Sequence, residues 1–135
     1  MKLFTPNAWL FVSVGIVVCA AALWGTWRIA NARSARILNR NQESLRTAIN
    51  TSLPVGSDRA RVEQFLREHS MYTDGYQKLD GGNNTGYDGA SGIIYASTGE
   101  VKTPLYLCKI VVTFKFDRDG RLKGYDDSAP CNGPF

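Results

Sequence analysis

Two cysteines offer the clearest chemistry in this chain. Cys108 and Cys131 are the only cysteines outside an apolar N-terminal segment, and about 23 residues separate them. A disulfide between them would fasten an otherwise loose C-terminal tail to a strand and add about 3 kcal/mol to the free energy of unfolding. Disulfides persist in oxidising compartments, so this pair favours a domain outside the cytoplasm. The alternative is two unpaired thiols, one of them buried in the core.

Catalytic and metal-binding patterns are weak. His69 is the single histidine, and it falls on the apolar face of a predicted helix, where packing or capping is its expected role. The sequence has no Cys-x-x-Cys or histidine-rich metal motif, and Gly89–Gly92 lacks the Gly-x-Ser-x-Gly order of a nucleophile elbow. We therefore expect a protein that is not an enzyme and that uses no cofactor and no metal.

An apolar run at the N-terminus dominates the sequence. The 25 residues from Leu3 to Trp27 include no Asp, Glu, Lys, Arg or His. About 20 apolar residues suffice for a helix to cross the hydrocarbon core of a bilayer. Trp9 lies near one end of the run and Trp24 and Trp27 at the other, where indole rings favour the headgroup layer. We predict a tail over residues 1–7 and a transmembrane helix over residues 8–30.

A cleaved signal peptide and a lipidated Cys19 are the alternatives to a retained anchor. The apolar core of a signal peptide usually spans about 7–15 residues, whereas this run continues past Ala20–Ala22 to Trp27. Val18 is a poor match to the small residue that precedes a lipidated cysteine. The length of the run favours the anchor.

Charge is distributed unevenly along the chain. The net charge is +4, of which residues 1–49 carry +5 and residues 50–135 carry −1. The nearly neutral second part does not favour nucleic-acid binding. Arg28, Arg33, Arg36 and Arg40 follow the apolar run, and the last three share one helical face. That face either contacts anionic lipid headgroups or is simply solvated.

The orientation of the anchor is open at this point. These arginines lie after the apolar run, and by the positive-inside rule they place the C-terminal domain in the cytoplasm. The predicted disulfide favours the opposite orientation.

Two further helices are expected after the anchor. Residues 31–52 contain neither Gly nor Pro and have a loose apolar stripe, which predicts a juxtamembrane helix. Pro54 and Gly56 interrupt it, and residues 53–135 form a small domain. Its first helix is capped by Ser57 or Asp58 and runs to about Ser70.

Strands follow the helices. Short strands are predicted over Tyr76–Leu79, Ile93–Thr98 and Leu122–Tyr125, with a hairpin turn at Asp117–Gly120. The strongest signal is one long strand over Leu105–Asp117, with an apolar even face and a wetter odd face that includes Lys109 and Lys115. The order predicts an α+β fold: a transmembrane helix, then two helices packed on a three- to four-stranded antiparallel sheet.

Apolar residues on the wetter face of the long strand mark a candidate partner surface. Leu105, Leu107 and Val111 lie there, and apolar side chains on a wet face indicate a covered surface. The glycine-rich loop over residues 80–92 is a second candidate.

Two motifs of the second part resemble a known family. The segment from Pro54 to Leu66 combines Gly56-Ser57 with Val62 at helical spacing, and Phe116 to Leu122 reads Phe-Asp-Arg-Asp-Gly-Arg-Leu. Both resemble small bacterial envelope proteins of the SmpA/OmlA type, which include a lipoprotein subunit of the outer-membrane β-barrel assembly machinery. The resemblance covers residues 45–128 and implies an α-α-β-β-β interaction module in the periplasm, here on a spanning anchor.

We therefore expect a single-pass protein of the bacterial inner membrane whose C-terminal domain is periplasmic and binds another envelope or membrane protein. A pilin-like structural subunit is an alternative, although the usual Gly-Phe cleavage point and following Glu are lacking. An inhibitor or immunity-type binding protein is another.

Overall fold

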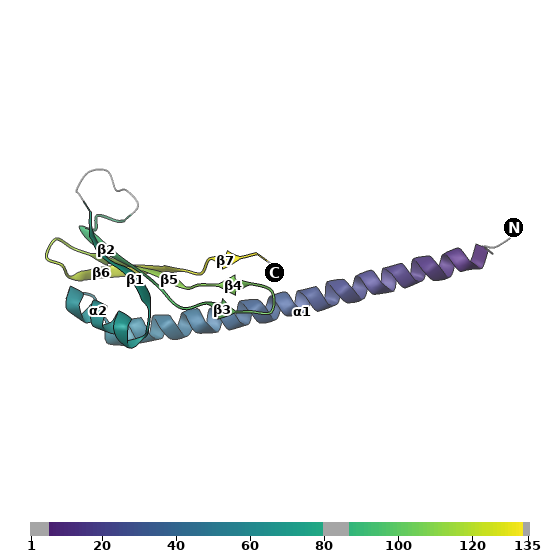
Figure 1. The fold of residues 1–135 in the computed structure, drawn as a ribbon, viewed down its shortest axis with the longest axis horizontal. Helices are drawn as coiled ribbons and strands as arrows, with labels where there is room; N and C mark the ends of the chain where they lie inside the picture. The colour runs from purple at the N-terminus through teal and green to yellow at the C-terminus, as the bar shows by residue number, and fades with distance from the viewer. Residues whose placement is uncertain (1–5, 80–86, 134–135) are drawn as a thin grey trace.

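The structure is a computed structural model that describes residues 6–79 and 87–133, with side chains from Val12 onward. Within these residues it contains two helices, α1 (Pro6–Ser52) and α2 (Arg59–Glu68), followed by seven strands (Figure 1). The strands are β1 (Tyr72–Lys78), β2 (Gly92–Ser97), β3 (Val101–Lys102), β4 (Leu107–Cys108), β5 (Val111–Phe116), β6 (Leu122–Ser128) and β7 (Cys131–Asn132). The predicted α+β class is confirmed.

The anchor and the predicted juxtamembrane helix are one helix. α1 runs for 47 residues without interruption, because no Gly or Pro occurs between Arg28 and Leu53. The described residues therefore contain two helices where the sequence predicted an anchor plus two. α1 ends where Pro54 cannot continue the helix, and the backbone N–H of Leu53 still donates to the carbonyl of Ile49 at 2.7 Å.

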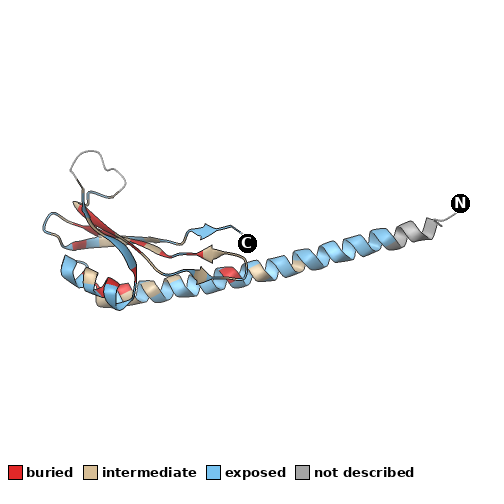
Figure 2. Ribbon diagram, in the orientation of Figure 1, coloured by how far each residue is buried: buried red, intermediate tan, exposed pale blue. Residues whose placement is uncertain are grey.

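α1 has an isolated half and a packed half. Its N-terminal half projects beyond the strands, whereas its C-terminal half lies along them (Figure 1). From Val12 onward, the first buried residue of α1 is Ser34, which is 3% exposed, and Ile49 further along is completely buried. Figure 2 shows this change from exposed to buried along the one helix.

α2 covers another part of the same core. The carboxylate of Asp58 accepts a hydrogen bond from the N–H of Arg61 at 3.0 Å and so caps the helix. Val62, Phe65 and Leu66 are buried, at the spacing of one helical face. His69 forms the C-cap and stacks on the ring of Phe65 at 4.0 Å, which agrees with the predicted capping role.

A four-stranded antiparallel sheet in the order β1-β2-β5-β6 provides the other side of the core. Ile94 of β2 lies opposite Phe114 of β5, which lies opposite Tyr125 of β6. Since alternate residues point to one face, this row faces the helices. The buried core combines residues of α1, α2 and this sheet: Ile49, Leu53, Val62, Phe65, Leu66, Met71, Ile94, Ala96, Ile110, Val112, Phe114, Phe116 and Leu122.

The predicted long strand over Leu105–Asp117 is wrong, because the structure divides it between two sheets. β5 belongs to the four-stranded sheet, and β4 pairs with β3 and β7 in a separate three-stranded antiparallel sheet. Between them, Lys109 donates its N–H to the carbonyl of Pro130 at 3.0 Å and Ile110 accepts from the N–H of Thr98 at 2.9 Å. The chain changes partners at these two residues while its alternation of buried and exposed positions continues.

The edges of the four-stranded sheet are longer than predicted. β1 begins at Tyr72 and β6 continues to Ser128. The predicted turn before β6 is present: Gly120 has a φ of +74°, and the carboxylate of Asp117 accepts from the N–H groups of Asp119 and Arg121. The last strand, β7, returns beside β4 toward the projecting half of α1 (Figure 1).

Candidate functional site

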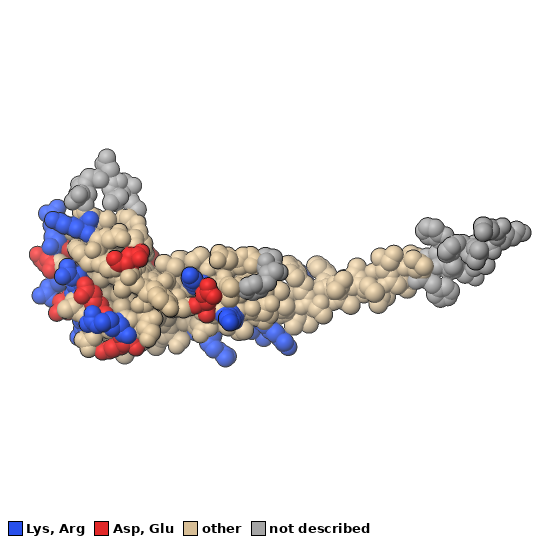
Figure 3. Space-filling model, viewed as in Figure 1, with Lys and Arg blue, Asp and Glu red and all other residues tan. Residues whose placement is uncertain are grey.

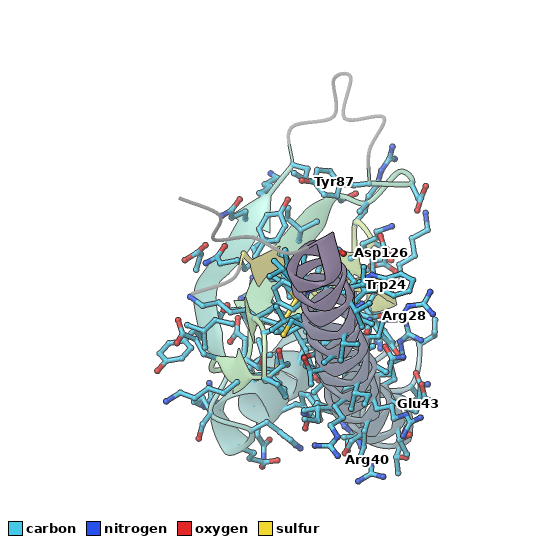
Figure 4. All side chains as sticks on the ribbon, turned by 90° about the vertical axis from the view of Figure 1, so that its right-hand side faces the viewer. Trp24, Arg28, Arg40, Glu43, Tyr87 and Asp126 are labelled. Atoms are coloured by element: carbon cyan, nitrogen blue, oxygen red, sulfur yellow. A yellow bond between two sulfur atoms is a disulfide. The ribbon has the colours of Figure 1, made fainter. Side chains whose placement is uncertain are left out.

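The projecting half of α1 exposes a continuous apolar surface. It is long and apolar enough to cross a membrane, and none of that stretch is buried in the protein. Trp24 and Trp27 are both exposed, and the guanidinium of Arg28 lies 4.6 Å from the ring centroid of Trp24 (Figure 4). The side chain of Trp9 lies outside those that the structure describes. On the face in Figure 3, charge gathers on the domain and on the adjoining part of α1, while the described part of the projecting half has none.

The predicted disulfide between Cys108 and Cys131 is present. The two residues face each other in the β4–β7 pair, so the bond fastens the last strand to its neighbour β4. Cys108 is buried and Cys131 is exposed. We use the name disulfide end for the part of the domain that contains β3, β4, the connection between them and β7, with the α1 stretch from Asn31 to Asn41 beside them.

An apolar groove of about 260 Å³ lies at the disulfide end, between α1 and the three-stranded sheet. One wall consists of Asn31, Ser34, Ala35 and Leu38 of α1, and the other of Thr103, Tyr106, both cysteines and Gly133. The small side chains of Ser34 and Ala35 keep the groove open. The hydroxyl of Ser34 donates a hydrogen bond to the carbonyl of Ala30 at 2.9 Å. Because this hydroxyl already has a partner within α1, a side chain that enters the groove does not need to supply one.

A basic concave surface lies on the other flank of the same α1 stretch. Its volume is about 370 Å³, and it is lined by Arg33, Arg36, Ile37, Arg40, Asn41 and Pro104. The three arginines are exposed, and within the described residues none of them forms an ion pair. Pro104 comes from the connection between β3 and β4, so the sheet and the helix build this surface together.

The predicted partner surface is distributed over two sheets. Leu105 and Leu107 belong to the disulfide end, while Val111 begins β5. All three are half-buried. Val111 lines a separate concave surface of about 480 Å³ with Tyr72 and Tyr95. Of the predicted contact loop, residues 80–86 lie outside the described part of the chain.

A buried lysine on the outer face of the four-stranded sheet was not foreseen. The side chain of Lys115 is only 7% exposed, and its ammonium lies 2.6 Å from carboxylate oxygens of Asp88 and of Asp126. Hydrogen bonds to both carboxylates raise the pKa of Lys115 above its ordinary value, and the hydrogen bond to Lys115 lowers the pKa of Asp88. The lysine is therefore fully charged near neutral pH, unsuited to act as a nucleophile.

This ion cluster fastens the segment that follows residue 86 to the sheet. The hydroxyls of Tyr87 and Tyr95 form a hydrogen bond next to it, which raises the pKa of Tyr95. Lys123 donates to the backbone carbonyl of Asp88. Since alternate residues of a strand point to opposite faces, Asp126 lies on the face away from the row that includes Tyr125 and faces the helices. The sequence did not predict this cluster, because the alternation along the strand placed Lys115 on the more polar face, where a lysine is expected to be exposed to solvent.

Polar contacts fix α1 to β6, an edge strand of the four-stranded sheet. Nε of Arg46 lies 3.0 Å from both carboxylate oxygens of Asp127, and Gln42 donates to the same carboxylate. The carboxylate is 9% exposed, and this contact raises the pKa of Arg46. Tyr125 donates to the side-chain oxygen of Asn50 at 2.9 Å. These bonds hold α1 in one orientation against the sheet.

A larger concave surface lies at the opposite end of the domain. It measures about 850 Å³ and lies between the C-terminal end of α1 and α2, with mainly polar residues along it, among them Asp58, Arg61, Gln64, Arg67 and Glu68. It is far from both the disulfide and the apolar half of α1 (Figure 1). Among the described residues, no group of three or more His, Cys, Asp or Glu could hold a metal ion.

Comparison with protein-family models, with curated proteins and with solved structures finds no match to this chain.

Proposed function

We propose that this chain is a non-enzymatic envelope protein of the bacterial inner membrane, anchored by one span and binding another membrane or envelope protein at its disulfide end. One observation carries the proposal: α1 continues without a break from its exposed apolar half into the hydrophobic core, where Ile49 is fully buried. An anchor of this kind holds the domain at a set height and angle above the bilayer. A surface near the bilayer is then always presented to neighbours in the same membrane.

The groove at the disulfide end is the surface that best fits a protein partner. It begins beside Asn31, about 6 Å along the helix from Trp27 at 1.5 Å per residue. Apolar concave surfaces with few polar groups are typical of sites that take a side chain of a partner. Leu105 and Leu107 belong to the same end and extend its apolar character.

The disulfide supports a domain outside the cytoplasm. A bond between Cys108 and Cys131 persists only where thiols are not kept reduced. The arginines after the span favour the reverse orientation. We give the disulfide more weight, because it holds the last strand, β7, against β4. The resemblance of residues 45–128 to SmpA/OmlA-type domains supports the periplasm as the compartment.

Photo-crosslinking at two small residues on opposite sides of α1 tests the proposal. Ala35 lines the groove, whereas Ser44, nine residues further along, is exposed on the opposite side of α1. A photoreactive amino acid at position 35 should capture a discrete membrane or envelope protein in living cells, and the same amino acid at position 44 should not. Equal capture at both positions, or capture at neither, would contradict the proposed binding surface.

A pilin-like structural subunit is the second candidate. The specific observation is that half of α1 is unpacked while the other half lies on an antiparallel sheet with a disulfide near its end. In this case the photoreactive amino acid would capture other copies of the same chain, and the product would form a ladder of multiples. An inhibitor or immunity-type protein would instead yield one product of fixed stoichiometry.

A further inference from the structure

We propose that Arg33, Arg36 and Arg40, together with Ile37 and Pro104, form a binding site for the headgroup of an anionic phospholipid. The ligand is a phosphate with a net negative charge attached to an apolar glycerol ester. The proposal rests on the membrane anchor of the proposed function and adds a lipid ligand on a different flank of α1 from the groove.

The site joins a charged rim to an apolar floor. The three arginines occupy positions i, i+3 and i+7 of α1 and so follow one side of the helix. Ile37 lies between them and is an exposed large apolar residue, and Pro104 closes the concave surface from the sheet side. Guanidinium groups bind phosphate oxygens in a bidentate manner, and the floor suits the carbon atoms next to the phosphate.

The arginines have no competing acidic partner. The ion pairs of α1 in the described residues all involve Arg46, with Glu43 and Asp127. Arg33, Arg36 and Arg40 make none, so an incoming phosphate does not have to displace a carboxylate. Like charges at this spacing destabilise a helix slightly, and a bound anion offsets that repulsion.

The height of the site matches the headgroup layer. At 1.5 Å per residue, Arg33 is about 9 Å and Arg36 about 14 Å beyond Trp27 along the helix axis. Side chains on a helix lean toward its N-terminus, which here is the direction of the bilayer. The polar layer beyond the hydrocarbon is about 5–8 Å thick on each side, so both guanidiniums extend toward it, and Arg40 forms the outer edge of the site.

The position of these arginines next to the headgroup layer favours a lipid over an acidic protein segment as the ligand. A protein ligand would be recognised equally well by arginines at any height, whereas these lie directly after the span. Each arginine near an anionic lipid surface raises the affinity for that lipid about fivefold. Arg33 and Arg36 together therefore raise it about 25-fold.

Native mass spectrometry of the full-length protein in detergent, titrated with phosphatidylglycerol or with zwitterionic phosphatidylcholine, tests the site. The wild type should bind one phosphatidylglycerol molecule with an affinity at least tenfold higher than for phosphatidylcholine. R33Q/R36Q/R40Q should lower the phosphatidylglycerol affinity about 25-fold and remove the preference. The control R61Q/R67Q/R118Q removes the same charge from exposed arginines remote from the span and should change the affinity less than twofold.

Other results would overturn the site. They are a wild type without lipid preference, an equal loss in both triple variants, or arginine-dependent binding of a polyglutamate peptide or inorganic phosphate in place of the lipid. Carbonate extraction of membranes tests the anchor separately: a protein that resists extraction but lacks the preference overturns the lipid site alone. Urea unfolding of each variant, followed by pulse proteolysis, confirms that its domain is folded.

Discussion

Replacing Ile49 by alanine should strongly destabilise the domain although the substitution lies in the anchor helix. Ile49 is 0% exposed and packs into the core. Removing three carbon atoms costs about 2.4 kcal/mol in transfer free energy, at about 0.8 kcal/mol per group. The cavity that remains raises the loss of unfolding free energy to about 3–4 kcal/mol.

Ile16 provides a matched control on the same helix. It is 64% exposed in the projecting half, so Ile16→Ala should change the unfolding free energy of the domain by less than about 0.5 kcal/mol. Because Ile49→Ala could prevent folding outright, Ile49→Val provides a graded variant with an expected loss of about 0.5–1.5 kcal/mol.

Urea unfolding of the full-length protein in detergent, followed by pulse proteolysis, measures these differences. With a slope of about 1.5 kcal/mol per molar urea, Ile49→Ala should lower the midpoint by about 2 M. Equal midpoints for the Ile49→Ala and Ile16→Ala proteins would refute the inference that α1 is both anchor and core element.

Three further predictions concern the rest of the domain. Replacing Cys108 and Cys131 together by alanine should lower the unfolding free energy by about 2–4 kcal/mol, measured by the same urea assay under non-reducing conditions. Gly92→Ala should cost about 1–3 kcal/mol because a Cβ there would clash with a tyrosine ring, whereas Gly99→Ala, with open space around it, should cost less than about 0.5 kcal/mol. The pKa of Asp88 is lowered in the folded state, so its stabilisation is present above 3.8 and is lost as the pH falls through the folded pKa. Unfolding curves of the wild type and Asp88→Asn should therefore converge in acid, and a constant difference down to pH 2 would contradict the ion pair.

Sequence patterns predicted those elements that are determined by residues close together in the chain. The uncharged run and the absence of Gly and Pro between Arg28 and Leu53 predict a helix that continues beyond the apolar segment. Asp58 as a cap and Gly120 in a hairpin turn follow from backbone chemistry within a few residues. The disulfide between Cys108 and Cys131 was expected from the number of cysteines outside the apolar segment.

Features that depend on distant partners could not be predicted in this way. The division of residues 105–117 into β4 and β5 depends on Thr98 and Pro130, and it leaves the period-two pattern intact. Lys115 is buried because Asp88, 27 residues away, comes back over it. The groove and the basic concave surface arise only where β3 and β4 lie beside α1.

The orientation of the anchor and the position of the domain can be tested with one labelling measurement. Asn39→Cys, in a Cys19→Ser background, places a single free thiol on the exposed surface of α1 near the disulfide end. In cells with a permeabilised outer membrane and an intact inner membrane, a membrane-impermeant maleimide should label this thiol fully. Labelling that occurs only after the inner membrane is broken would place the domain in the cytoplasm and contradict the account.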